Sequence, residues 1–241
     1  VSHEVRQSAS HILDRIKDVK EDGDIVIYGD EDEELYHVFP VDHFVITINK
    51  NLRAGGMYDE SSSGYKDGKY NVYITVQPNP DLYVLNHELR HAYEDYKRIS
   101  KGKTPMSKTK EVTNLFGGNF EQLMTGQLRG NYGIFPSVIR ALYFTSKVEE
   151  SAYGETIYDQ VDGVFRNLRD ILRVNYKKEG KYNPARVTTW WNEFKKDVNI
   201  PVVNKFNDYQ SFLDWADKTI KDRGNKAMKK FLKIKYLRNK I

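Results

Sequence analysis

The sequence predicts an α+β protein in which a small twisted sheet is followed by one well-marked helix and a helical C-terminal part. Two observations support this prediction. Between residues 24 and 77, short segments alternate β-branched or aromatic residues with polar ones, as strands do. From residue 79 onward, apolar residues recur at three- and four-residue steps, which is the period of a helix with one buried face.

The composition fits a folded chain with a sizeable core. A length of 241 residues suits one domain with an extension, or two small domains. Only 39% of the residues are hydrophobic, but 17 Tyr, 11 Phe and 3 Trp supply large side chains, so we expect an aromatic-rich core. We predict a first domain over residues 1–180 and a helical C-terminal extension over residues 181–241.

The chain has no cysteine. This excludes disulfides, cysteine-ligated zinc and thiol catalysis, and it leaves His and carboxylates as ligands for a metal. No apolar run of about eighteen residues exists, so no transmembrane segment is expected. The first twenty residues are polar and show no signal peptide, which favours a soluble protein. The compartment stays open, because a cleaved signal peptide would leave no trace.

The first elements are predicted in order from local patterns. Ser8–Lys20 is expected to be a short amphipathic helix. Strands are expected at Asp24–Tyr28, Leu35–Pro40, His43–Asn49 and Lys69–Gln77. Residues 50–69 are rich in Gly, Ser and Asp and are expected to form a long mobile connection.

The clearest helix prediction is Asn79–Gly102. Asn79 is a good N-cap residue and Pro80 suits the first helical position. Gly102 follows a basic last turn, which is typical of a helix end. One apolar stripe follows the helical period: Leu82, Leu85, Leu89, Ala92, Tyr96 and Ile99.

This helix contains the sequence His-Glu-x-x-His. His87 and His91 are four residues apart, so on a helix both imidazoles lie on one face, opposite the stripe. Two neutral imidazoles in this arrangement can clamp a zinc ion, and Glu88 can take a proton from a metal-bound water. The alternative is a solvated helix with two surface histidines. The other histidines have no partner at ligand spacing and are expected to be structural.

The strand Lys69–Gln77 runs almost directly into this helix. An edge strand beside a metal cleft can pair with an extended peptide through backbone hydrogen bonds and so orient a substrate. The alternative is an ordinary internal strand.

The chain beyond the motif is expected to be mostly helical. Gly102–Gly118 is predicted to be a polar loop, and Asn119–Gly126 a short helix or turn. A long helical pattern runs from about residue 136 to about residue 178. Two further helices are expected at Asp208–Arg223 and Asn225–Leu237.

A catalytic zinc ion normally has a third protein ligand, and the long helical stretch offers two carboxylates for it. These are Glu149 and Glu150, which follow His91 by 58 and 59 residues. The apolar direction averaged over the stretch favours Glu150, whereas the immediate apolar neighbours bracket Glu149. Helical phase alone therefore leaves both open.

The segment His87–Tyr96 resembles the active-site helix of the thermolysin-like zinc peptidases in its two His, its Glu, the Leu and Ala around them and the Asp-Tyr at its end. Glu149 with Ala152 resembles the E-x-x-A ligand helix of the wider gluzincin group. The resemblance covers about residues 70–155. It implies a zincin-like fold, Zn²⁺ held by Glu149 and the two histidines, and a peptide or protein substrate. The family's Asp four residues after the ligand Glu has no counterpart here.

These residues together predict a zinc-dependent peptidase that hydrolyses peptide bonds with a metal-activated water and Glu88 as general base. Two alternatives stay open. One is a catalytically silent zincin-like protein with a structural or binding role in a larger assembly. The other is a basic partner-binding or nucleic-acid-binding protein in which the motif is accidental.

The positive charge of the chain is concentrated in its tail. Residues 225–241 contain seven of the 38 Lys and Arg and no acid, which leaves 31 basic residues against 34 acidic ones in residues 1–224. Such a tail can dock to an acidic partner or surface, or it can form a solvated basic helix that covers the domain.

Overall fold

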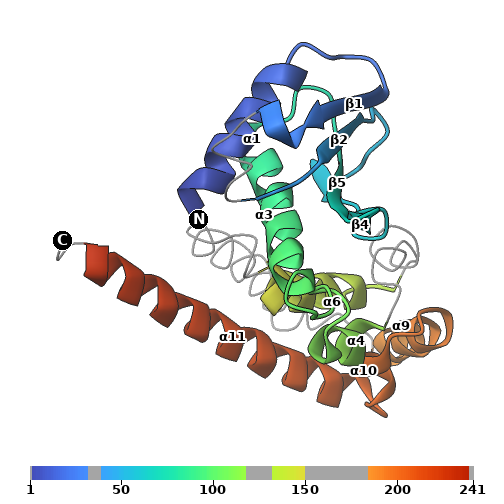
Figure 1. Ribbon diagram of the computed structural model, residues 1–241. Helices are drawn as coiled ribbons and strands as arrows, with labels where there is room; N and C mark the ends of the chain where they lie inside the picture. The colour runs from blue at the N-terminus through green and yellow to red at the C-terminus, as the bar shows by residue number, and fades with distance from the viewer. Residues whose placement is uncertain (1, 32–38, 118–131, 150–183, 239–241) are drawn as a thin grey trace. The chain divides into compact units, whose positions relative to one another are not determined.

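The computed structural model describes residues 2–31, 39–117, 132–149 and 184–238, and these form an α+β protein with one small mixed sheet (Figure 1). Two compact units divide the chain at Met106. The boundary predicted at residue 180 lies outside the described residues. In the described part of the chain, no helix has both the length and the apolar character that crossing a membrane requires.

The sheet belongs to the first unit and has the strand order β1-β2-β5-β3, with β4 also paired to β5. Only the β2–β5 pairing is parallel; the other pairings are antiparallel. The strands are β1 (Gly23–Tyr28), β2 (His43–Ile48), β3 (Gly56–Tyr58), β4 (Gly64–Lys66) and β5 (Lys69–Val76). Three predicted strands, β1, β2 and β5, are thus confirmed to within one residue at each end. Most of the fourth, predicted at Leu35–Pro40, lies outside the described residues.

The prediction of a mobile connection over residues 50–69 was wrong, because this segment forms β3 and β4, which both pair with β5. The link from β4 to β5 is the pair Asp67-Gly68, whose φ angles are 51° and 79°. Positive φ at both positions is what a tight two-residue hairpin turn requires. The Asp-Gly pair was the overlooked signal.

Two helices cover one face of the sheet. These are α1 (Ser2–Ile16) and α3 (Leu82–Ile99), which lie side by side in Figure 1. Ile12 and Ile16 of α1 are fully buried, as the amphipathic pattern predicted, although the helix begins before Ser8 and ends before Lys20. A short 3-10 turn, η1 (Gly29–Glu31), follows β1.

An aromatic cluster joins α3 to the sheet. Phe39 packs against the rings of Phe44, Tyr70, Tyr93 and Tyr96 at centroid distances of 5.3 to 6.3 Å. Rings of this size dominate the burial energy of a core. The expected aromatic-rich core is therefore confirmed, and it fixes α3 against β5.

The start of α3 differs from the prediction. Asp81, not Asn79, is the N-cap residue: its carboxylate accepts a hydrogen bond from Val84 N at 2.7 Å. Asn79 lies in the left-handed region with φ 54°, so the chain turns there between β5 and the helix. The predicted end is confirmed, since Gly102 has φ 68° and donates its N–H to Ile99 O.

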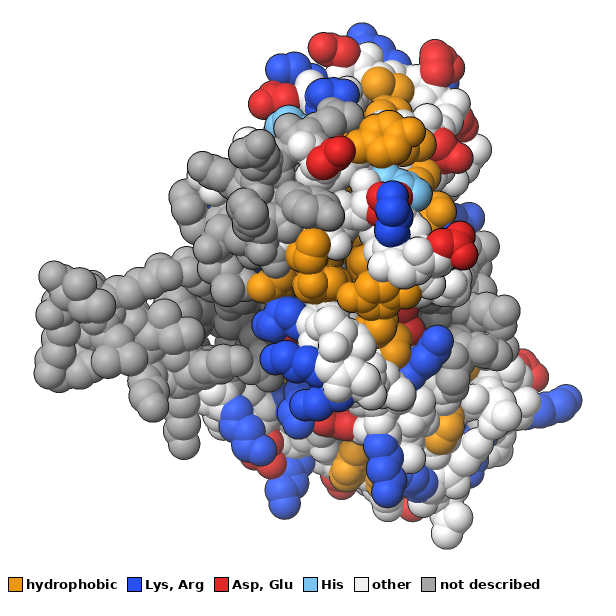
Figure 2. Space-filling view, in the orientation of Figure 1, with side chains coloured by type: hydrophobic (Ala, Val, Ile, Leu, Met, Phe, Trp, Pro, Cys, Tyr) orange, Lys and Arg blue, Asp and Glu red, His pale blue; other side chains and the backbone are white. Residues whose placement is uncertain are grey.

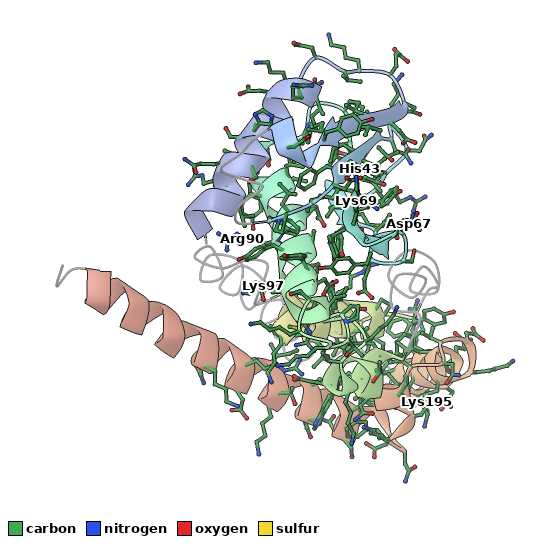
Figure 3. The ribbon with its side chains drawn as sticks, viewed as in Figure 1. His43, Asp67, Lys69, Arg90, Lys97 and Lys195 are labelled. Atoms are coloured by element: carbon green, nitrogen blue, oxygen red, sulfur yellow. The ribbon has the colours of Figure 1, made fainter. Side chains whose placement is uncertain are left out.

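The sheet face away from these helices carries polar residues among exposed hydrophobic ones. Val26 and Tyr28 of β1 are 47% and 57% exposed. Figure 2 shows such hydrophobic patches between charged side chains. At the ends of β2 and β5, Asp42 accepts from His43 Nδ1 at 3.0 Å and from Lys69 Nζ at 2.8 Å, and Figure 3 shows the histidine and the lysine close together. His43 is therefore held by its hydrogen bond to Asp42, which is a structural contact.

The second unit is helical in its described part. Its helices are α4 (Lys110–Phe116), α6 (Phe135–Phe144), α9 (Pro184–Asp197), α10 (Pro201–Asn204) and α11 (Tyr209–Arg238). The prediction of a loop over Gly102–Gly118 was wrong in part, because α4 forms within this range. The two helices predicted at the C-terminal end are one continuous helix, α11. The predicted turn at 119–126 lies outside the described residues. The helical pattern from residue 136 is confirmed by α6, and its course after residue 149 is not described.

Aromatic rings also build the core of this unit. Trp191 is 2% exposed and packs against Phe135 and Phe212, with ring centroids 5.1 and 5.2 Å apart. Arg223 of α11 donates to Leu142 O of α6 at 2.9 Å. These contacts hold α6 among α9 and α11, and α6 leads directly into the segment that contains Glu149.

Candidate metal centre

The burial of α3 decides which way its histidines face. Leu85, Leu89 and Ala92, in the middle of the predicted stripe, are fully buried against the sheet and α1. Because successive residues turn by about 100°, this orientation places His87 and His91 away from the core. Both are half-buried. The predicted separation of an anchoring face from a histidine face is therefore confirmed.

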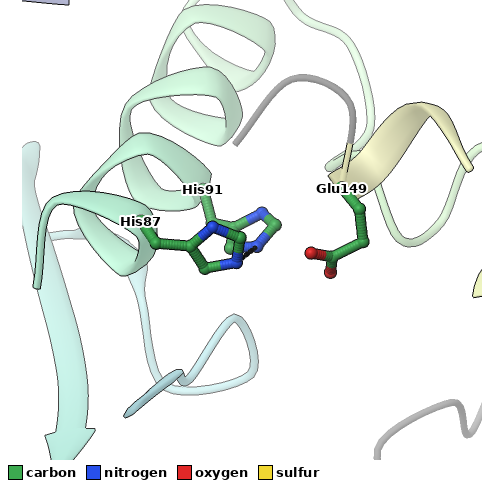
Figure 4. A group of neighbouring side chains, drawn as sticks. All are labelled: His87, His91 and Glu149. Atoms are coloured by element: carbon green, nitrogen blue, oxygen red, sulfur yellow. Dashed lines mark hydrogen bonds between the residues drawn. The ribbon is translucent and has the colours of Figure 1, made fainter. Parts of the chain in front are cut away.

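The two imidazoles converge at one point. Their Nε2 atoms are 3.1 Å apart, with the ring planes at 89° (Figure 4). Two nitrogens held at about 2.0–2.1 Å from a tetrahedral zinc ion would lie roughly 3.3 Å apart. The observed separation is close to that value. It also suits a hydrogen bond between two neutral imidazoles, one donating and the other accepting.

A third donor lies beside the histidine pair. Residues 147–149 form a short helical segment just after α6, and Glu149 within it is 3% exposed. One ligand atom from each of Glu149, His87 and His91 lies within 4.8 Å of the other two, and Figure 4 shows the carboxylate facing the imidazoles. The structure thus brings together three residues that the sequence singled out. The alternative ligand Glu150 lies outside the described residues.

The donor set fits a metal ion. Two imidazole nitrogens and one carboxylate form a ligand set of known catalytic zinc sites, which keep a fourth position for water or substrate. A buried carboxylate is costly unless positive charge or hydrogen-bond donors compensate it. A divalent cation beside the two imidazoles would add positive charge next to the buried Glu149 carboxylate. The group is therefore geometrically and chemically able to hold a metal.

Glu88 lies next to the ligand pair but is not one of the three converging residues. Its side chain is 8% exposed, and its Oε2 accepts a hydrogen bond from Tyr58 N of β3 at 2.8 Å.

No family model, curated protein or solved structure matches this chain. Function must therefore be argued from the chemistry of the site.

Sequence reasoning missed a second buried acid on α3. Asp95 is 3% exposed, and its carboxylate accepts a hydrogen bond from Met106 N at 2.8 Å. Burial raises the pKa of its carboxyl to about 7, while hydrogen bonding from Met106 and Tyr58 acts in the opposite direction. Burial likewise raises the pKa of the Tyr58 hydroxyl. The only sequence signal was the position of Asp95, two turns after Glu88, on the same side of the helix.

Tyr83 adds an aromatic ring at the start of the histidine face. It is 38% exposed and lies stacked with His87, with ring centroids 6.5 Å apart and planes 24° apart. The ring restricts the orientation of the imidazole. Its position one turn before His87 was available as a signal, but exposed aromatic residues are common on helices.

Proposed function

We propose that this protein is a zinc-dependent peptidase of zincin type. His87, His91 and Glu149 would hold the metal, and Glu88 would act as general base. The observation that supports the proposal most is the convergence of three donors from separate parts of the sequence, all within 4.8 Å of one another. Chance surface histidines would not be expected to meet a buried carboxylate in this way.

The residues of the chain divide the chemistry between them. Bound zinc would polarise a substrate carbonyl and make a water more acidic. Glu88 would take the proton from the attacking water and deliver it to the leaving nitrogen of the cleaved bond. Because Glu88 is one residue from a ligand on the same helix, its backbone keeps a fixed distance to the backbone of that ligand.

The substrate backbone would be oriented by β3 and not by the strand that precedes the helix. The hypothesis of an edge role for Lys69–Gln77 was wrong, because β5 has neighbours on both sides. Among the described residues β3 is an edge strand of the sheet, and it contacts α3. Its outward backbone groups, apart from the Tyr58 N–H that donates to Glu88, can pair with an extended peptide without reading its side chains.

The proposal is tested first by metal content. We expect purified protein to contain one zinc per chain by elemental analysis and the His87→Ala variant to lose it. His43→Ala is the matched control. It should leave zinc binding unchanged, because His43 is hydrogen-bonded to Asp42. Protein that takes up no zinc at stoichiometric concentrations would refute a metal site.

Cleavage is tested separately. We expect chelator-sensitive cleavage of an unfolded protein substrate, with Glu88→Gln keeping the zinc and losing at least about 100-fold in turnover, the range of a general base. Glu94→Gln is the control on the same helix, since Glu94 pairs with Lys97. Full zinc occupancy without any cleavage would instead favour a silent binding protein.

A further inference from the structure

The strand β3 presents its backbone to Glu88. Backbone hydrogen bonds join Gln77 N to Gly55 O at 3.2 Å and Asp59 N to Tyr73 O at 2.9 Å. In an antiparallel pair such bonds recur at every second residue, so the backbone groups of Gly56 and Tyr58 point away from β5. One of them, Tyr58 N–H, donates to Glu88 Oε2 at 2.8 Å.

The strand reaches Glu88 because position 56 has no side chain. A Cβ on Gly56 would lie 2.7 Å from Val84 Cγ1 and 2.9 Å from Glu88 Cγ, closer than real Cβ atoms approach. The neighbouring Gly55 is nearly as tight, with 3.1 Å from its would-be Cβ to Val84 Cγ2. The backbone of β3 therefore lies directly on the turn of α3 that contains Glu88.

The side chain of Tyr58 is held in place as well as its backbone N–H. Its side chain is 9% exposed and points to the core side of the sheet, where the hydroxyl interacts with the Asp95 carboxylate. Asp95 is fixed in turn by Met106 N at 2.8 Å. A residue anchored through its side chain cannot easily withdraw its backbone N–H from Glu88.

We propose that β3 is a positioning element for Glu88, with Gly56 setting the distance between strand and helix and Tyr58 N–H fixing the orientation of the Glu88 carboxylate. This inference rests on the proposed function, in which Glu88 is the general base. A glutamate side chain has several rotatable bonds, and a hydrogen bond to one carboxylate oxygen limits the orientations that the side chain can adopt. A misplacement of about 1 Å can lower a rate by about 100-fold.

The first test moves the strand without changing any ligand. Gly56→Ala forces β3 and Glu88 apart, so kcat should fall at least about 10-fold while zinc affinity stays within about twofold and KM changes less than kcat. Gly23→Ala in β1 is the matched control, since no atom lies within 4 Å of its added Cβ. It should keep wild-type kinetics. A Gly56→Ala variant with wild-type kcat overturns the proposal.

The second test requires neither bound zinc nor a measurement of catalysis, and it remains informative even if Gly56→Ala folds poorly. In the metal-free protein, the amide of Tyr58 should exchange its hydrogen at least about 10-fold faster in Glu88→Ala than in the wild type, as followed by NMR, with the amide of Asp59 unchanged. Equal exchange at Tyr58 overturns the positioning contact. If exchange responds but wild-type protein cleaves nothing, the contact is real and the proposed peptidase function fails, and the positioning role fails with it.

Discussion

At the scale of single residues, the candidate site depends on side chains that are costly to bury unless each has a defined partner. Glu88 accepts a hydrogen bond from a backbone N–H, Asp95 accepts one from Met106 N, and Glu149 faces two imidazoles. All three carboxylates are less than 9% exposed. Buried carboxylates are enriched at functional sites, because burial and neighbouring charge adjust their protonation.

The assignment of Glu149 as third ligand predicts a loss of metal affinity on its removal. We expect Glu149→Ala to weaken zinc binding by at least about 100-fold, because the loss of a mere supporting partner already costs about 10–100-fold. Glu150→Ala should retain wild-type affinity. Competition with a chromophoric chelator measures both. The opposite ranking of the two variants would make Glu150 the ligand.

The raised pKa of Asp95 predicts a pH dependence of stability. Its carboxyl has a pKa of about 7 in the folded protein against 3.8 ordinarily, so the folded state binds this proton more tightly than the unfolded chain does. The free energy of unfolding therefore falls as the pH rises from about 4 to about 7. At about 1.4 kcal/mol per pKa unit, the loss is on the order of 4 kcal/mol.

Asp95→Asn should remove this fall in the free energy of unfolding with rising pH, because the amide oxygen still accepts a hydrogen bond from Met106 N but the side chain carries no charge. We expect the variant to be more stable than the wild type at pH 8 and about equally stable at pH 4, as measured by urea unfolding. Taking the difference between the two proteins cancels the other titrating groups. A difference that is the same at both pH values would contradict a pKa near 7.

At the scale of elements, α3 is the helix on which the site is built, and its position depends on its two ends and its buried stripe. Asp81 caps the first turn, and the basic residues of the last turn complement the negative end of the helix dipole. The cap lies six residues before His87, so the first turn supports the histidine face directly.

Removal of this cap gives a prediction at the same scale. Asp81→Ala should lower the free energy of unfolding by about 1 kcal/mol, because Val84 N–H loses its acceptor. Asp81→Asn keeps an acceptor oxygen and should be close to the wild type. Chemical denaturation followed by far-ultraviolet circular dichroism measures both. Equal losses in the two variants would point to the charge at this position and not to the cap.

At the scale of the whole molecule, the first compact unit contains the sheet, α1, α3 and the aromatic cluster around Phe39. A unit with its own hydrophobic core is able in principle to fold alone. The second unit has a separate aromatic core around Trp191. The long basic helix α11 belongs to it, and the proposed docking of the tail to an acidic partner remains a prediction.

A fragment of residues 1–106 tests this division and the ligand set together. We expect it to fold, as shown by amide exchange protection in β2 and β5, and to bind zinc at least about 100-fold more weakly than the full chain, because it retains two of the three ligands. Affinity equal to that of the full chain would mean that Glu149 does not take part. An unfolded fragment would show that the first unit depends on the rest of the chain.

Local pattern was enough to predict β1, β2, β5 and the stripe of α3, because alternation and the 3.6-residue period are properties of neighbouring residues. It also placed His87 and His91 on one face with Glu88 beside them. Prediction from local pattern failed for short strands that are rich in glycine and polar residues. Residues 50–69 were expected to be a loop, yet they contain β3.

Periodicity could not choose between Glu149 and Glu150, bring β3 onto Glu88 or reveal that Asp95 is buried. Each of these depends on contacts between residues far apart in the chain, and such contacts follow from how the elements pack and not from the order of residues within them. The His-Glu-x-x-His motif is thus a local property of the chain. The meeting of Glu149 with the histidines, and the backbone contact that holds Glu88, arise only in the folded protein.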